Sequence, residues 1–220
     1  MNISLFKSKL LPVLSIIFLF IFWKLPLDIN YFEIILATLF VFLVSYIEFK
    51  SDYLKSLGFN KKDFTLNNLL IKAPLYAFGL FILYYFILLP VVTYITKQPI
   101  DFSAFDSIKN NPSLLVISLV FIWISAAFGE EIVWRGYFMK QFVKLFGEGK
   151  LSISLNIVLF GILFGMLHSY QGITGQIVTG ISGAILSFIF YKHKYNLWLN
   201  IAIHGFFDSI ALLLLYFEFL

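Results

Sequence analysis

Apolar residues recur along the chain in long runs that are separated by more polar segments. A membrane-spanning helix needs about 20 mostly apolar residues. By that measure the sequence predicts seven spans, at about residues 10–27, 31–49, 73–96, 114–134, 153–169, 173–191 and 197–218. The stretch from Pro112 to Gly147 is too long for one perpendicular span, so we expect one tilted helix or two helices broken near Gly129. We therefore predict an all-α, polytopic transmembrane bundle of seven or eight helices.

Composition supports a membrane protein. The chain is 60% hydrophobic and 13% charged, with a mean hydropathy of +0.92, whereas soluble domains carry about 25% charged residues. It has no cysteine, which excludes disulfides and thiolate zinc sites. The net charge of +4 is modest and its basic residues are scattered between apolar segments, so we predict no nucleic-acid partner.

The lysines predict an orientation. With the N-terminus inside, the outer segments hold only Lys24, Lys97 and Lys109. The inner segments then hold Lys7, Lys9, Lys50, Lys55, Lys61, Lys62, Lys72, Lys140, Lys144, Lys150, Lys192 and Lys194. This asymmetry follows the positive-inside rule. No small-residue cleavage site follows the first apolar run, so we expect a retained span and not a signal peptide.

The chain reads as one integral membrane domain. Residues 1–112 contribute hydrophobic helices, and residues 113–220 carry the polar clusters described below. The polar connection 50–72 is expected on the inner surface, with a short amphipathic helix. Small residues recur every fourth position in the sixth span, which predicts close helix packing at Gly175, Thr179, Gly183 and Ser187. Frequent Lys, Ile, Asn and Phe are typical of an AT-rich genome, so we predict a bacterial cell membrane.

Ionisable residues inside the predicted spans are the candidates for function. Such a group costs at least about 2.5–3.5 kcal/mol at mid-bilayer, so it is expected to face a cavity and to pair. The candidates are Glu130, Glu131, Arg135, His168, His204 and Asp208. Arg135 is the one arginine of the chain, and the remaining histidine, His193, lies in a loop.

Spacing suggests how these residues pair. Glu131 and Arg135 stand four residues apart, so their side chains can meet on one helix face. Glu130 points about 100° away and is left free to act as a general base. The alternative is a buried ion pair that only sets helix register.

His204 and Asp208 have the same spacing, and a carboxylate can fix the orientation of an imidazole. The alternative is a local helix hydrogen bond. His168, at the end of an apolar helix, is either an interface residue or part of the same site.

Counting from the turn near Gly149 places Glu130 and His168 at a similar depth, each roughly 28 Å away. The same counting puts His204 at a different depth, which would require a tilt or a break in the sixth helix.

Together the three clusters resemble the motifs of the CPBP intramembrane proteases, also called the CAAX-protease/Abi family. The family pattern E-E-x-x-x-R, F-x-x-x-H and H-x-x-x-N/D reads here as Glu130-Glu131-x-x-x-Arg135, Phe164-x-x-x-His168 and His204-x-x-x-Asp208. The resemblance covers about residues 114–218. It implies an intramembrane endopeptidase with a membrane-embedded active-site cavity, acting on a protein or peptide that can itself be membrane-anchored.

The resemblance also implies residue roles. Glu130 would activate the hydrolytic water, supported by Glu131 and Arg135. His168 would position the water or the scissile carbonyl, and His204 with Asp208 would polarise that carbonyl. The branch that processes prenylated proteins tends to carry Asn at the last position. Because a carboxylate only accepts hydrogen bonds, Asp208 fits better as the group that orients His204.

A cofactor is not required by this chemistry. Zinc held by His168, His204 and either Glu130 or Asp208 is the alternative, but Glu130 as a ligand would no longer be the base. Two other functions stay open: a non-catalytic scaffold or immunity protein, and a proton-coupled transporter. A transporter would show internal repeats, and none is visible in the sequence.

Overall fold

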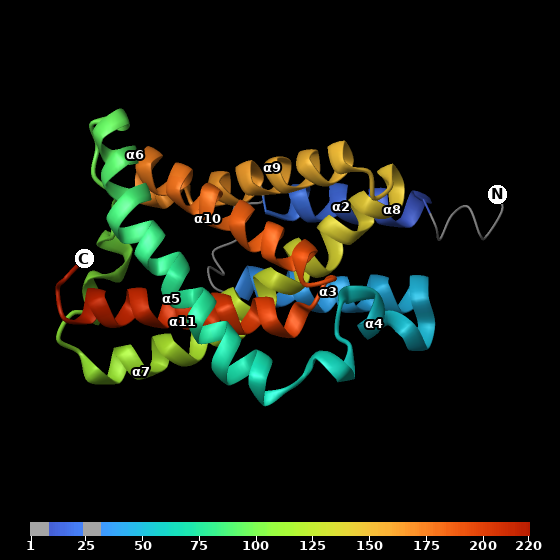
Figure 1. Cartoon of the computed structure of the whole chain (residues 1–220), viewed down its shortest axis with the longest axis horizontal. Coiled ribbons are helices and arrows are strands. Elements are labelled where there is room, and N and C mark those ends of the chain that lie inside the picture. The colour runs from blue at the N-terminus through green and yellow to red at the C-terminus, as the bar shows by residue number, and fades with distance from the viewer. Residues whose placement is uncertain (1–8, 24–31) are drawn as a thin grey trace.

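The computed structural model describes residues 9–23 and 32–220, and this part of the chain is helical without a strand (Figure 1). The all-α prediction is therefore confirmed. In chain order the α-helices are α2 (Leu11–Phe22), α3 (Phe32–Phe49), α4 (Tyr53–Leu57), α5 (Ala73–Leu83), α6 (Leu89–Thr96), α7 (Pro112–Phe121), α8 (Lys140–Phe146), α9 (Lys150–Leu167), α10 (Gly172–Lys192) and α11 (Leu197–Tyr216). More widely wound π-helical segments join several of them: η4 (Asn67–Lys72), η5 (Tyr84–Leu88), η7 (Ile122–Glu130) and η8 (Ile132–Met139).

Within the described residues, six helical stretches are long and apolar enough to cross a bilayer. They are Phe32–Asp63, Asn67–Thr96, Pro112–Phe146, Lys150–Leu167, Ser169–Lys192 and Leu197–Tyr216. The predicted first span corresponds to α2, whose 12 residues fall short of the length that a span requires. Residues 24–27 of that prediction lie outside the described part. The chain is thus a polytopic helical bundle.

The long stretch after Pro112 is one continuous helix of 35 residues, so of the two predicted alternatives the unbroken helix is the one observed. A Cβ atom at Gly129 would lie 3.1 Å from Thr38 Oγ1 and 3.2 Å from Ile34 Cγ1. The glycine therefore allows α3 to approach this helix closely. The middle of the stretch is wound as η7 and η8, a geometry that often marks functional sites in long helices.

Glycines also bring α9 and α10 together, and the two helices run side by side (Figure 1). A Cβ at Gly165 would lie 2.3 Å from the Gln176 carbonyl oxygen, and one at Gly161 would lie 2.8 Å from Ala184 Cβ. Any larger residue at either position would separate the helices. This close pair fixes α10 beside the long central helix.

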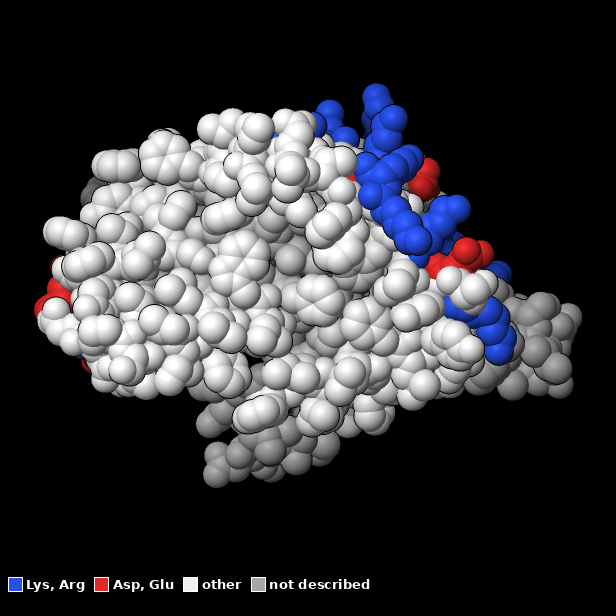
Figure 2. All heavy atoms as spheres, turned by 90° about the horizontal axis from the view of Figure 1, so that it is seen from below, with Lys and Arg blue, Asp and Glu red and all other residues white. Residues whose placement is uncertain are grey.

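Basic side chains gather at one end of the face that Figure 2 shows, and a broad uncharged region separates them from the opposite end. This distribution agrees with the lysine asymmetry of the sequence, while the N-in orientation itself stays a prediction. At the basic end Gln141 Nε2 donates to Glu48 Oε2 at 2.7 Å, and Lys144 pairs with the same carboxylate. These contacts hold α8 against the end of α3.

The connection after α3 contains the predicted short helix, α4. This helix is capped at its C-terminus by Gly58, whose φ is +103°. The Leu197 amide donates to the Gly58 carbonyl at 3.2 Å. Gly58 therefore attaches this surface segment to the start of α11, the helix that carries His204 and Asp208.

We expect Gly58→Ala to destabilise the fold. A left-handed conformation costs a residue with a side chain about 1–2 kcal/mol, and the new Cβ would also lie 2.5 Å from the Tyr195 carbonyl oxygen. Gly79→Ala is the control, because Gly79 lies within the α5 helix and a Cβ there would have nothing within 4 Å. Thermal unfolding in detergent should show the larger drop in melting temperature for Gly58→Ala. Equal shifts would contradict the proposed attachment.

Candidate active site

The Glu131 carboxylate is the centre of the polar cluster. Its side chain is fully buried, and Arg135 Nη1 donates to Glu131 Oε1 at 2.7 Å. This is the contact that their four-residue spacing predicted. Because an isolated buried charge is very costly, the pair is stable only if its remaining polar atoms are also bonded.

The other nitrogens of Arg135 bind α10. Nη2 donates to the Gly183 carbonyl at 2.7 Å, and Nε donates to Ser187 Oγ at 3.3 Å. A Cβ at Gly183 would lie 2.7 Å from a ring carbon of Phe164, so only glycine fits there. Two members of the small-residue stripe therefore hold the arginine. Helix packing alone, which the sequence predicted for them, is an incomplete description.

The remaining bonds to Glu131 come from α11. Asn200 Nδ2 donates to Glu131 Oε2 at 3.1 Å and to the Leu186 carbonyl at 2.9 Å. His204 Nδ1 lies 3.0 Å from Glu131 Oε1, and His204 Nε2 lies 3.3 Å from Asp208 Oδ2. The imidazole is therefore held between two carboxylates. The contact with Asp208 is the one that the four-residue spacing predicted, and Glu131 is a second partner that the sequence did not predict.

Glu130 differs from its neighbour. Its side chain is only half-buried, and among the described residues it makes no side-chain hydrogen bond. It nevertheless lies within electrostatic range of His204, Asp208 and Arg135. The structure thus places one unbonded carboxylate next in sequence to a carboxylate whose two oxygens are both bonded.

His168 reaches the cluster through Phe164. Its Nδ1 lies 2.8 Å from the Phe164 carbonyl oxygen, and the two rings are 4.8 Å apart. The Phe164 ring also lies 6.3 Å from the His204 ring and 4.9 Å from Arg135 Cζ. His168 is within electrostatic range of His204 and Arg135. Phe164 therefore joins the three motifs through direct contacts.

The depth mismatch predicted for His204 does not occur, because His204 contacts Glu131 directly. Helix α10 runs unbroken through Gly172–Lys192, so no break compensates for it. Counting residues from two turns gives a common depth only for parallel helices, and Figure 1 shows α10 inclined to α11. Because α10 and α11 are inclined to each other, the difference in depth that residue counting predicts for His204 does not arise.

The predicted alternative of a zinc site does not fit this arrangement. Within the described residues, no group of three or more His, Cys, Asp and Glu side chains could hold a metal ion. Both His204 nitrogens face carboxylates, and His168 Nδ1 faces a backbone carbonyl. A metal at His204 would have to displace Glu131 or Asp208.

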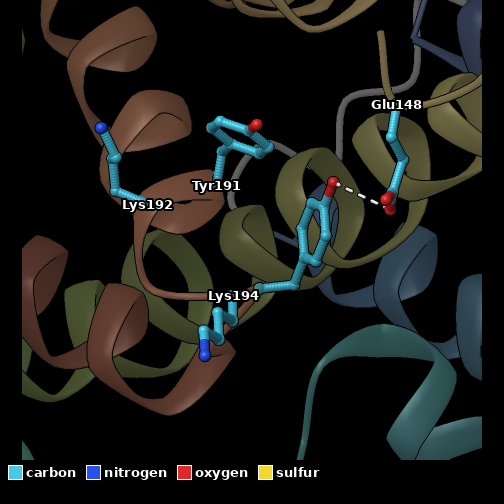
Figure 3. Close-up of a pocket in the computed structure, with 5 residues that line it drawn as sticks. Glu148, Tyr191, Lys192 and Lys194 are labelled. Atoms are coloured by element: carbon cyan, nitrogen blue, oxygen red, sulfur yellow. Dashed lines mark hydrogen bonds between the residues drawn. The ribbon is translucent and has the colours of Figure 1, made fainter.

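Two pockets lie elsewhere, at the basic end. One of about 320 Å³ is lined by Glu148, Tyr191, Lys192, Lys194 and Tyr195, and a long Tyr195–Glu148 hydrogen bond of 3.4 Å crosses it (Figure 3). The other, of about 300 Å³, lies between α3, α4, η8 and α8. Neither includes the Glu131 network, so the cavity expected around Glu130 stays a prediction.

Comparison with known families gives one match. Residues 112–210 match the family described as type II CAAX prenyl endopeptidase Rce1-like. Over this segment the chain is therefore similar to the CAAX-protease family. The matched residues include all six candidates, from Glu130 to Asp208, and the resemblance inferred from the three motifs is confirmed. Comparison with curated proteins and with solved structures gave no significant match.

Asn200 is the network residue that sequence reasoning missed. The criterion of an ionisable side chain within a span does not find an amide. The sequence does indicate Asn200, because this polar residue lies four positions before His204 in an otherwise apolar helix and therefore on the same helix face. Ser187 was noted only for its size.

We expect Arg135→Met to destabilise the protein by about 3–5 kcal/mol, because Glu131 would be left as an unpaired buried charge. The double variant Arg135→Met/Glu131→Gln removes that charge and should recover part of the stability. Chemical unfolding in detergent measures both. If Glu131→Gln lowered the free energy of unfolding of Arg135→Met as much as it lowers that of the wild type, the two residues would not be coupled. The ion pair would then not be the stabilising contact.

Proposed function

We propose that this protein is an intramembrane endopeptidase that hydrolyses a peptide bond with a water activated by Glu130. The observation that carries the proposal is the contrast between the two adjacent glutamates. Glu131 is bonded at both oxygens and can only support its neighbours, whereas Glu130 is unbonded within the described residues and lies within electrostatic range of His204. A free carboxylate beside an oriented imidazole is the arrangement that general-base hydrolysis requires.

The reaction follows from these positions. Glu130 accepts a proton from a water molecule, and the resulting hydroxide attacks the scissile carbonyl carbon. The tetrahedral intermediate carries an oxyanion, and the His204 Nε2–H, whose contact with Asp208 is the longer of its two at 3.3 Å, shares its hydrogen bond between Asp208 and this oxyanion. Glu130 then returns the proton to the leaving nitrogen as the C–N bond breaks. His168 positions the water from the Phe164 side.

The substrate is a protein or peptide that reaches the site from the bilayer. The family match is to endopeptidases of prenylated C-termini, so a prenylated peptide is the first probe. The family branch that processes prenylated proteins tends to have Asn at the position of Asp208. The contact of Asp208 with His204 supports an orienting role for this carboxylate. Non-prenylated peptides and membrane helices are therefore tested beside the prenylated one.

Glu130→Gln should abolish cleavage while leaving the fold intact. Removing a general base costs about 10²–10⁴ in rate, and Glu130 has no side-chain hydrogen bond to lose among the described residues. The measurement is cleavage of internally quenched peptides, prenylated and unprenylated, in proteoliposomes with a metal chelator present. Melting temperature is measured in parallel.

Glu148→Gln is the matched control, since Glu148 is exposed at the basic end. It should retain wild-type cleavage. Cleavage by Glu130→Gln at the wild-type rate would contradict the mechanism, and activity that needs zinc would contradict the metal-free form. Flux of ions or solutes without cleavage would instead favour the transporter alternative.

A further inference from the structure

A cavity of about 300 Å³ lies at the basic end of the bundle, between α3, α4, η8 and α8, and we call it the basic-end cavity. Its wall combines apolar residues such as Phe49 and Leu57 with lysine, serine and glutamine side chains. It is separate from the Glu131 network, and the proposed hydrolysis does not involve it. Basic pockets between membrane-spanning helices are typical binding sites for the headgroups of anionic lipids. The contacts of the charged and polar residues in the wall indicate which ligand the cavity can bind.

Lys140, the first residue of α8, gives the cavity a cation without a carboxylate partner. Its side chain is half-buried, and within the described part of the chain it forms no ion pair. Its Nζ donates one long hydrogen bond of 3.4 Å to the Lys55 carbonyl oxygen, and it lies 5.7 Å from the centre of the Tyr195 ring. An ammonium group has three N–H donors, so Lys140 has donors left for a ligand.

The other charges at this end leave a surplus of positive charge. Lys144 also lines the cavity, and its charge is compensated by Glu48. The one carboxylate in the wall is that of Glu148, which is exposed and also lines the neighbouring pocket beside Lys192 and Lys194 (Figure 3). The lysines of the two pockets therefore outnumber these carboxylates, and their combined field attracts an anion.

Two polar atoms of the wall residues are buried without a hydrogen-bond partner among the described residues, namely Ser45 Oγ and Gln141 Oε1. The amide nitrogen of Gln141 donates to Glu48 Oε2 at 2.7 Å, so its oxygen is left as an acceptor. Buried polar atoms normally find partners. A ligand that carries hydroxyl donors beside its negative charge would satisfy this acceptor as well as the free cation, and a glycerol phosphate headgroup has both.

We propose that the basic-end cavity binds the headgroup of an anionic glycerophospholipid, with Lys140 donating to the phosphate and a headgroup hydroxyl donating to Gln141. Basic side chains gather where the broad uncharged surface ends (Figure 2), which is the depth at which the phosphates of a surrounding bilayer lie. Gly136 and Tyr137 in the wall directly follow Arg135, so the bound headgroup stabilises the helix that carries the site network. The inference goes beyond the proposed peptidase function and does not depend on it.

Lys140→Gln removes the cation and keeps most of the length of the side chain. We expect the apparent Kd for phosphatidylglycerol to rise about fivefold, because one lysine beside an anionic lipid contributes about 1 kcal/mol and about 1.4 kcal/mol corresponds to a factor of ten. Native mass spectrometry of the purified protein in an uncharged detergent, with phosphatidylglycerol added in steps, measures this constant. The melting temperature without lipid shows whether the variant is folded.

Lys150→Gln is the matched control, since Lys150 is exposed at the start of α9 and lines neither pocket. It should bind phosphatidylglycerol like the wild type, and equal weakening in both variants would overturn the proposal. Phosphatidylcholine, which has no net charge, should bind more weakly than phosphatidylglycerol, and equal binding would also overturn it. Soluble glycerol 3-phosphate that bound as tightly as the lipid would contradict the assignment to a membrane lipid. No peptide substrate is present, so the outcome is independent of the peptidase function.

Discussion

The site depends on one buried carboxylate. Glu131 has no exposed surface and receives Arg135, Asn200 and His204 on its two oxygens. A carboxylate without these partners would be very unfavourable inside an apolar bundle, so folding must bring all of them together. Arg135 extends the same network to Gly183 and Ser187. One charge thereby fixes the relative positions of the central helix, α10 and α11.

That constraint explains why two adjacent glutamates have different tasks. The bonds to Glu131 also fix the rotation of the helix that carries both residues, and Glu130 lies within electrostatic range of His204 and Asp208 without a bond of its own among the described residues. The imidazole of His204 is held at both nitrogens. A rigid support with one free base is consistent with preorganised catalysis, in which the protein does not rearrange during the reaction.

Local pairs could be predicted from the sequence, and contacts between distant helices could not. The Glu131–Arg135 and His204–Asp208 contacts follow from four-residue spacing along one helix. Asn200 and Ser187 remained hidden because their roles depend on which helix face meets Glu131 and Arg135. The prediction of the depth of His204 was wrong for a similar reason, since residue counting assumes parallel helices.

Single-turnover cleavage of the prenylated peptide in ¹⁸O-labelled water tests the central claim most directly. If Glu130 activates water that attacks the carbonyl directly, the new carboxylate of the product carries one labelled oxygen in the first turnover, and the enzyme carries none. An unlabelled first product, with the label found later in the Glu130 side chain, would mean that Glu130 attacks the substrate itself. That result would contradict the account of a carboxylate acting only as a base.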